Sequence, residues 1–369
     1  MTALDASTSS GQKAALASAS FRYRPALDGI RALAVLAVLV SHSWGQVARG
    51  GWLGVDVFFV LSGYLITALL TVEWQLTGHI RLRTFYLRRA LRLLPALSAT
   101  IALSLLVAFI EWPLSAADTA REAIGAMGYI ANWLIVVGVV HSGLLVHTWS
   151  LAIEEQFYWV WPIALFAALR LGGRRVALTV ALVGALLSTG DHLLFSNGAY
   201  FRTDARAGAL LLGCVAALAE SLGYLRIVPR RAWNVVGILS AMALVVGALV
   251  VQEDRAIGLS LTWIDFAAMF LVLAVTQHES GRIALILSTG SLVWVGQRSY
   301  GIYLYAAPAA ALIQPFAGGD GWLPLLVGCL MAVGMATASY RYLEQPFLRL
   351  KRKAAPAGAL PSALPADHP

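Results

Sequence analysis

Charged residues are scarce in this chain, and cysteine is nearly absent. Only 12% of the 369 residues are Asp, Glu, Lys or Arg, whereas 59% are hydrophobic. Soluble globular domains carry about twice that share of charge, so the composition excludes a soluble globular domain. It also disfavours a disordered chain and a nucleic-acid-binding protein. The two cysteines, Cys214 and Cys329, lie in apolar runs and are too few for a disulfide framework or a metal cluster. We therefore expect a protein of the lipid bilayer without a metal site.

The chain also has no glycine-rich phosphate loop, which disfavours a nucleotide-driven motor. We do not expect the first residues to be a secretory leader, because the first apolar run begins near Gly29 and carries Asp28 and Arg31 at its start. Residues 1–20, rich in Ala, Ser and Thr, are predicted to be a flexible cytoplasmic tail. Residues 349–369 are predicted to be a basic, Pro- and Ala-rich cytoplasmic tail, and residues 21–348 to form one membrane domain.

Eleven apolar runs approach the roughly 20 residues that a spanning helix needs. They are 29–47, 52–71, 93–110, 123–140, 149–169, 176–190, 207–222, 232–251, 256–276, 299–316 and 322–339. If the run 123–140 does not cross the membrane, both termini and 22 of the 27 Lys and Arg residues lie in the cytoplasm. This agrees with the rule that Lys and Arg are enriched on the cytoplasmic side of membrane proteins. We therefore predict an all-α, polytopic bundle of the inner (plasma) membrane, with about ten spans. The run 123–140 becomes a re-entrant or surface-lying segment on the outer face.

Ionisable residues inside spans are costly and mark a cavity or a pathway. In the first run, Asp28, Arg31 and His42 are spaced 3 and 11 residues apart, so they share one helical face. Asp56 enters the second run from the outer side, at a depth similar to that of His42. These positions predict a polar pocket in the outer third of the bilayer.

The fifth run brings further carboxylates to the same depth. Glu154 and Glu155 enter it from the outside, and Ser150, Glu154 and Tyr158 lie on one stripe. A histidine beside a carboxylate is a general-base arrangement, so His42 is predicted to be a base with Asp56 or Glu154 as its partner. Two alternatives remain: a buried ion pair that only fixes helix packing, and the proton relay of a transporter.

Arginines crowd the second cytoplasmic loop. Arg88, Arg89 and Arg92 precede an apolar run, and such a cluster is typical of a topology anchor. Guanidinium groups also match phosphate geometry, so a nucleotide-bearing donor such as coenzyme A is the second interpretation.

These residues belong to motifs that resemble the acyltransferase-3 family of integral membrane O-acyltransferases. The motifs follow in family order from about residue 24 to residue 347. They are Asp28-Gly-Ile-Arg31 followed by His42, Gly54-Val-Asp56-Val-Phe-Phe-Val-Leu-Ser62-Gly-Tyr64, Arg88-Arg89-Ala-Leu-Arg92, Ser150-Leu-Ala-Ile-Glu154-Glu155-Gln156-Phe-Tyr158 and Tyr340-Arg341-Tyr-Leu-Glu344.

The resemblance implies transfer of an acetyl or other short acyl group from cytoplasmic acyl-CoA, with no permanently bound cofactor. The acceptor would be a hydroxyl of a sugar, glycolipid, surface polysaccharide or glycosylated natural product. A proton-coupled transporter of a small metabolite is the rival reading, although no internal repeat supports it. The predicted catalytic residues are His42, Asp56 and Glu154, and the predicted donor-binding residues are Arg88, Arg89 and Arg92. The predicted pocket residues are Asp28, Arg31, Ser62, Tyr64, Ser150, Glu155, Gln156, Tyr158, Asp204, Arg206 and Tyr303.

Two positions depart from the family pattern. Tyr305-Ala306 stand where the family commonly has Trp-His, and Gly208 stands where it commonly has a second Asp. Both lie in later helices that could shape the acceptor site, so the acceptor stays open.

Overall fold

The computed structural model describes residues 23–43, 49–111, 116–141, 143–194, 199–251, 257–313, 322–347 and 349. Within these ranges the chain is helical and contains no strand. The α-helices are α2 (Pro25–Ser43), α3 (Gly54–Thr77), α4 (Leu82–Glu111), α5 (Ala116–Met127), α6 (Ala131–Val136), α7 (Trp149–Leu194), α8 (Thr203–Ser221), α9 (Arg230–Val250), α10 (Ile257–Gln277), α11 (Arg282–Leu287), α12 (Gly290–Gln297), α13 (Ser299–Ile313) and α14 (Trp322–Ser339).

Short helices complete the bundle. Four are 3₁₀-helices, η1 (Gly51–Leu53), η3 (Val146–Thr148), η4 (Ala199–Phe201) and η5 (Tyr224–Ile227), and the π-helical turn η7 (Tyr340–Glu344) follows α14. The predicted tails 1–20 and 349–369 lie outside the described residues, apart from Arg349.

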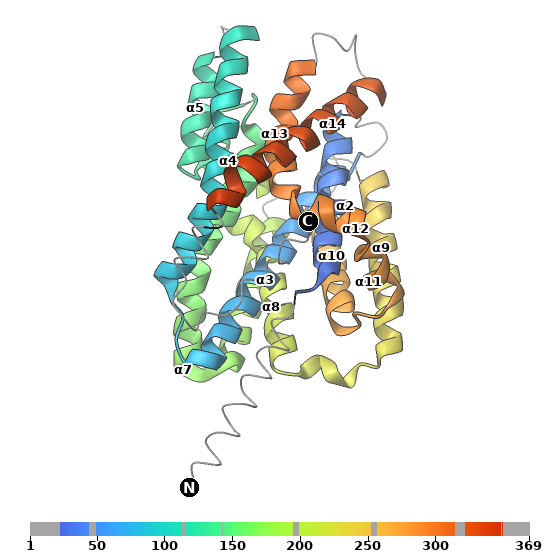
Figure 1. Cartoon of the computed structure of the whole chain (residues 1–369). Coiled ribbons are helices and arrows are strands. Elements are labelled where there is room, and N and C mark those ends of the chain that lie inside the picture. The colour runs from blue at the N-terminus through green and yellow to red at the C-terminus, as the bar shows by residue number, and fades with distance from the viewer. Residues whose placement is uncertain are drawn as a thin grey trace.

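Helix α3 is the centre of the bundle. It packs against α2, α7, α8 and α10 (Figure 1), and most of its side chains are buried because the sequence is apolar almost throughout. The helix ends at Gly78, whose φ of 65° is the left-handed conformation that glycine adopts without strain.

Six helices of the described part are long and apolar enough to cross a membrane. They are Gly51–Thr77, Leu82–Ile110, Val146–Asp191, Arg230–Val250, Leu259–Gln277 and Leu326–Phe347. Helices α2, α8 and α13 do not meet this standard; α8, for example, carries Asp204, Arg206 and Glu220. The chain is therefore a multi-pass membrane protein. The predicted number of about ten spans, which requires these three helices and two crossings by α7, stays a prediction.

Helix α7 consists of two arms. Its 46 residues are interrupted at Gly172 and Gly173, whose backbone angles are not helical, and the predicted runs 149–169 and 176–190 lie in the two arms. The predicted non-crossing run 123–140 falls on α5 and α6, which have 12 and 6 residues. Neither is long enough to span a bilayer.

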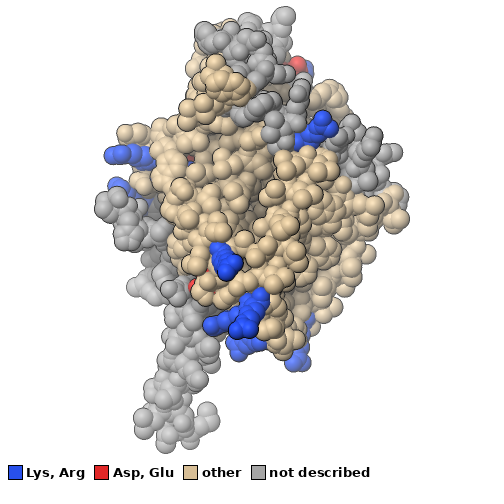
Figure 2. Space-filling view, turned by 90° about the vertical axis from the view of Figure 1, so that its right-hand side faces the viewer, with Lys and Arg blue, Asp and Glu red and all other residues tan. Residues whose placement is uncertain are grey.

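One end of the bundle is rich in arginine. It holds the end of α3, the turn of α7 and the stretch from Arg226 to Arg231, and it lies at the bottom in Figure 1. We call it the arginine end. Figure 2 shows the largest group of Lys and Arg side chains on one face near this end, with mostly uncharged surface above it. This separation of charge and apolar surface fits a helix bundle with one end at a membrane boundary.

Two glycines allow α3 and α8 to pack with their backbones in contact. A Cβ at Gly63 would lie 1.8 Å from the carbonyl oxygen of Leu210, and a Cβ at Gly213 would lie 2.0 Å from that of Val60. Because the opposing atoms are backbone, a larger side chain would force the helices apart.

Gly213→Ala should therefore destabilise the protein by about 1–3 kcal/mol, the usual cost of overpacking. The matched control is Gly334→Ala in α14, where no neighbouring atom lies within 4 Å of the new Cβ. Thermal unfolding in detergent measures the difference. Equal melting temperatures for the two variants would contradict the close packing of α3 on α8.

Candidate active site

A cavity of about 400 Å³ follows α3 through the bundle, and we call it the passage. Its lining on α3 extends from Val55 to Glu73. At 1.5 Å per residue these 18 steps measure about 27 Å, close to the roughly 30 Å of a hydrocarbon core. Residues of α2, α4, α7 and α13 form the other walls. The lining on α3 is therefore about as long as a hydrocarbon core is thick.

One face of α3 supplies an apolar stripe to the passage. Phe58, Ser62, Leu65 and Leu69 follow the i, i+4, i+7, i+11 spacing of a single helical face, all four line the passage, and all are partly exposed. Three of them are apolar, so Ser62 is the one polar side chain of the stripe.

Six arginines line the passage. Four of them are paired with carboxylates: Arg24 with Glu220 at 2.8 Å, Arg31 with Asp28 at 3.0 Å, Arg81 with Glu73 at 3.0 Å, and Arg89 with Glu155 at 2.5 Å. The other two, Arg88 and Arg92, make no hydrogen bond or ion pair with any described residue. The passage thus has two guanidinium groups that could approach an anion.

The carboxylate of Glu154 is the centre of the polar site. Its Oε1 accepts a hydrogen bond from the Ser62 hydroxyl and another, at 2.8 Å, from Tyr158. Nη2 of Arg89 lies 3.6 Å from the same oxygen. The guanidinium of Arg89 also lies over the Tyr158 ring, 3.4 Å from its centroid. Side chains from α3, α4 and α7 therefore converge on one carboxylate in the wall of the passage.

A second hydroxyl pair lies at the start of α7. Ser150 and Tyr303 are 2.8 Å apart through their hydroxyl oxygens, and Tyr303 donates to the backbone carbonyl of His147 at 2.7 Å. The His147 ring packs edge-on against Tyr303. Both hydroxyls line the passage, so polar groups continue beyond Glu154 toward the end opposite the arginines.

Asp56 lies behind the passage wall and not in it. Its Oδ1 is 2.8 Å from Nη2 of Arg206, and both side chains are almost completely buried. Asp265, for which the sequence identifies no partner, is the third charged group of this cluster, with Asp56 and Arg206 as its charged neighbours. The guanidinium of Arg206 also faces the Tyr200 ring at 5.0 Å. These contacts tie α3, α8 and α10 together.

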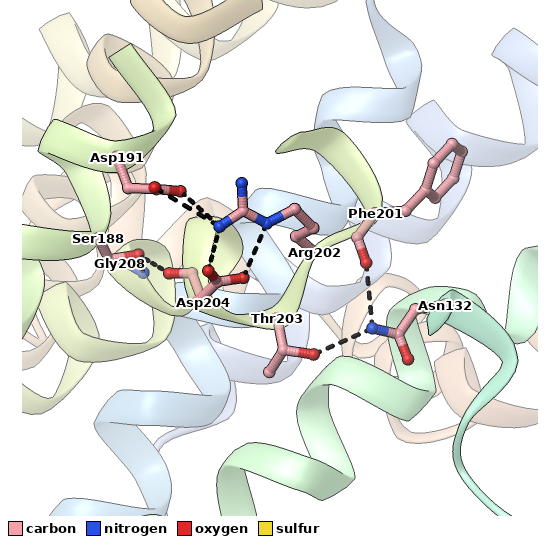
Figure 3. Close-up of polar contacts among 8 residues, drawn as sticks. All are labelled: Asn132, Ser188, Asp191, Phe201, Arg202, Thr203, Asp204 and Gly208. Carbon is pink, nitrogen blue, oxygen red and sulfur yellow. Dashed lines mark hydrogen bonds and ion pairs between the residues drawn. The ribbon is translucent and has the colours of Figure 1, made fainter. Parts of the chain in front are cut away.

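Gln156 and Asp204 belong to a separate polar network. Gln156 donates to Oδ1 of Asn132 at 2.9 Å and accepts from Thr203 at 2.5 Å. Figure 3 shows Asn132 bonded to Thr203, and Arg202 between Asp191 and Asp204. The network joins α6 to the start of α8.

The predicted site residues thus fall into three groups. Eleven line the passage: Asp28, Arg31, Ser62, Tyr64, Arg88, Arg89, Arg92, Ser150, Glu154, Tyr158 and Tyr303. Five are outside it: Asp56, Glu155, Gln156, Asp204 and Arg206. His42 lies in the last turn of α2, and its side chain is outside the described part of the structure.

Fold and site define a multi-pass helical membrane protein with a long polar passage and a hydroxyl–carboxylate cluster. A family model described as an acyltransferase domain matches residues 24–341, so the chain belongs to the acyltransferase-3 family. It is 33% identical over 350 residues to peptidoglycan O-acetyltransferase OatA of Listeria monocytogenes, covering 89% of this chain and 56% of that protein. It is 34% identical over 358 residues to O-acetyltransferase OatA of Staphylococcus aureus, covering 90% and 58%.

The chain therefore spans little more than half the length of these relatives. No solved structure matches it.

Glu122 is a buried polar residue that the sequence does not point to. It lies on α5, is 2% exposed, and accepts a hydrogen bond from the backbone N–H of Leu145 at 2.8 Å. Burial raises the pKa of this carboxyl from 4.5 to about 7. Because the partner of Glu122 is a backbone N–H 23 residues away in the chain, only the fold reveals that Glu122 holds the loop before α7.

This pKa predicts how stability depends on pH. The folded protein binds the Glu122 proton more tightly than the unfolded chain does, so stability falls as the pH rises from about 4.5 through about 7. Glu122→Gln should flatten this decline in melting temperature between pH 5 and pH 8. Asp118→Asn, which removes an exposed carboxylate of the same helix that adds only the smallest part of this shift, should flatten it much less. An unchanged slope in Glu122→Gln would contradict the assignment.

Proposed function

We propose that the chain is a membrane O-acyltransferase. It takes an acetyl or other short acyl group from acyl-CoA on the cytoplasmic side and transfers it to a hydroxyl of a carbohydrate on the other side. The observation that carries this proposal is the passage itself, with arginines in its lining, two of them without an ion pair among the described residues, and a hydroxyl–carboxylate cluster in its wall. Membership of the acyltransferase-3 family supports the reaction class.

The arginine end is the proposed cytoplasmic side. Lys and Arg residues are enriched on the cytoplasmic side of membrane proteins. The arginine end holds such residues from three segments: the end of α3, the turn of α7 and the Arg226–Arg231 stretch. This orientation gives cytoplasmic termini in the inner (plasma) membrane.

Arg88 and Arg92 are the proposed ligands of the donor's phosphates. Neither makes an ion pair with a described carboxylate, and guanidinium forks bind phosphate oxygens in pairs. The charged neighbours of Arg92 are Arg31 and Arg89, which are positive, and Glu344 and Asp28, which are negative. Arg89 has another role, because Glu154 and Glu155 already hold its guanidinium. It orients Glu154.

Leu65 and Leu69 of the stripe would accept the pantetheine arm of the donor. An extended flexible arm fits a narrow apolar passage, and its thioester end would then reach Ser62 and Glu154 from the arginine side. No cofactor needs to be bound permanently, because acyl-CoA is a substrate.

The acceptor is proposed to be a surface carbohydrate. The named relatives are O-acetyltransferases, one of them of peptidoglycan, and a sugar hydroxyl would enter from the end that holds Ser150 and Tyr303. His42, in the last turn of α2, lies toward that end and is the proposed catalytic histidine on the acceptor side. Arg206 contacts one oxygen of Asp56.

The direct test uses purified protein in lipid nanodiscs with acetyl-CoA and soluble cell-wall glycan. We expect release of free CoA together with an acetyl ester on the glycan, detected by mass spectrometry. Protein that consumes no acetyl-CoA in the presence of several carbohydrate acceptors would refute the proposal.

Arg92→Ala should weaken acetyl-CoA binding by about 1.5–3 kcal/mol, the value of a hydrogen bond to a charged group. This corresponds to about 10- to 150-fold in the dissociation constant. Arg83→Ala is the matched control, because Arg83 lies on the same helix but is exposed and outside the passage. Equal losses in both variants, or normal binding in Arg92→Ala, would mean that the cluster serves only as a topology anchor.

His42→Gln should lower acetyl transfer to the glycan by at least about 100-fold, the lower range for general-base catalysis. Acetyl-CoA binding should stay close to wild type, because the substitution keeps hydrogen bonding and removes only the titratable group. Near-normal transfer by this variant would exclude His42 as the catalytic histidine.

A further inference from the structure

The hydroxyl of Ser62 is placed like an activated nucleophile. It lies on the passage face of α3 between apolar neighbours, and it donates its proton directly to Oε1 of Glu154. A hydroxyl within hydrogen-bonding reach of a base, which is itself oriented by a third group, is the arrangement used in covalent catalysis. Here Tyr158 and Arg89 are the orienting groups, since both approach the same carboxylate oxygen.

The other serine of the passage lacks this arrangement. Ser150 is 2.8 Å from the Tyr303 hydroxyl and 3.4 Å from the carbonyl oxygen of His147, and its hydroxyl contacts no carboxylate. A tyrosine hydroxyl and a carbonyl cannot accept a serine proton at neutral pH as a carboxylate can. The difference singles out Ser62.

We propose that Ser62 carries the acyl group as a covalent ester between two half-reactions. This relay rests on the proposed function, because the acyl group comes from the thioester of acyl-CoA. Ser62 divides the passage: it is 7 residues, or about 10 Å, from the Val55 end of the lining and 11 residues, or about 16 Å, from the Glu73 end.

In the first half-reaction, Oγ of Ser62 attacks the thioester carbonyl carbon and its proton passes to Glu154. The carbon–sulfur bond breaks, the sulfur takes the proton from Glu154, and free CoA leaves toward the arginine end. Arg89, 3.6 Å from Glu154, holds this carboxylate in position to take the proton.

In the second half-reaction, an acceptor hydroxyl attacks the ester carbonyl carbon from the other end, and its proton passes to Glu154, the carboxylate that contacts Oγ. The bond between Ser62 Oγ and the acyl carbon breaks, and Oγ recovers that proton from Glu154. His42 is 11 residues beyond Arg31, the last α2 residue that lines the passage, and it acts on the acceptor there. Each half-reaction starts and ends with balanced bonds and protons, and neither needs an oxidant or a reductant.

The dimensions of the passage favour such a relay. A volume of about 400 Å³ is near the lower end of ligand sites, which favours binding donor and acceptor in turn. With an acyl-Ser62 intermediate, the donor leaves before the acceptor arrives. The relay also keeps the two large substrates on opposite sides of the membrane.

The test is isotope exchange between acetyl-CoA and labelled free CoA, catalysed by the full chain in nanodiscs without any acceptor. An acyl-enzyme makes this exchange possible, whereas direct transfer does not. We expect exchange by the wild type, a loss of at least about 100-fold in Ser62→Ala, and partial recovery in Ser62→Cys, which restores a nucleophile. Ser98→Ala, on the exposed side of α4 away from the passage, should exchange like the wild type.

His42→Ala should still catalyse the exchange, because His42 acts only in the second half-reaction, although its transfer to glycan is lost. Mass spectrometry of acid-quenched protein should find the acetyl ester on the peptide that contains Ser62. Acetyl-CoA binding by Ser62→Ala verifies that this variant folds, and the ester on wild-type protein tests the relay independently of any variant.

Exchange that persists in Ser62→Ala, or an acetyl group found on another residue, would overturn the relay. Wild-type protein that acetylates a glycan but shows neither exchange nor an ester would also overturn it, while leaving the proposed function intact. Protein that neither exchanges nor consumes acetyl-CoA with glycan present would refute both.

Discussion

The carboxylate of Glu154 is the group on which the arrangement of the site depends. A carboxylate in a membrane bundle is costly unless charge and hydrogen bonds compensate it, and Ser62, Tyr158 and Arg89 supply that compensation. These partners come from three helices, so satisfying one charge fixes how α3, α4 and α7 meet. The same requirement leaves a polar patch in an otherwise apolar passage, which is where acyl transfer is proposed.

The second buried charge cluster has a different consequence. Asp56 and Arg206 are 2.8 Å apart and buried, and Asp265 approaches them from α10. Because these groups are outside the passage, their contacts favour the packing interpretation over a direct part in proton transfer. Together with the backbone contact at Gly63 and Gly213, they hold α3 against α8. The wall that carries Ser62 is thereby kept rigid.

Sequence patterns predict the helical membrane architecture well, because hydropathy reports which segments are apolar over the thickness of a bilayer. They also bring together most passage residues, since motifs on α2, α3, α4 and α7 each carry polar groups at helical spacing. They do not predict partners between distant helices. Depth along a span places Asp56 near His42, and this pairing stays a prediction because the His42 side chain lies outside the described residues; depth does not predict the contact of Asp56 with Arg206. The arginine cluster likewise does not predict that Arg89 contacts Glu155 and Glu154.

The central claim is that the passage connects a donor on one side of the membrane with an acceptor on the other. Reconstitution into sealed proteoliposomes tests it most directly, with acetyl-CoA enclosed and soluble glycan either outside or enclosed as well. The account predicts acetylated glycan when donor and acceptor are on opposite sides, and little when both are on the same side of an intact membrane. Efficient acetylation with both substrates on one side, and none across the membrane, would contradict it.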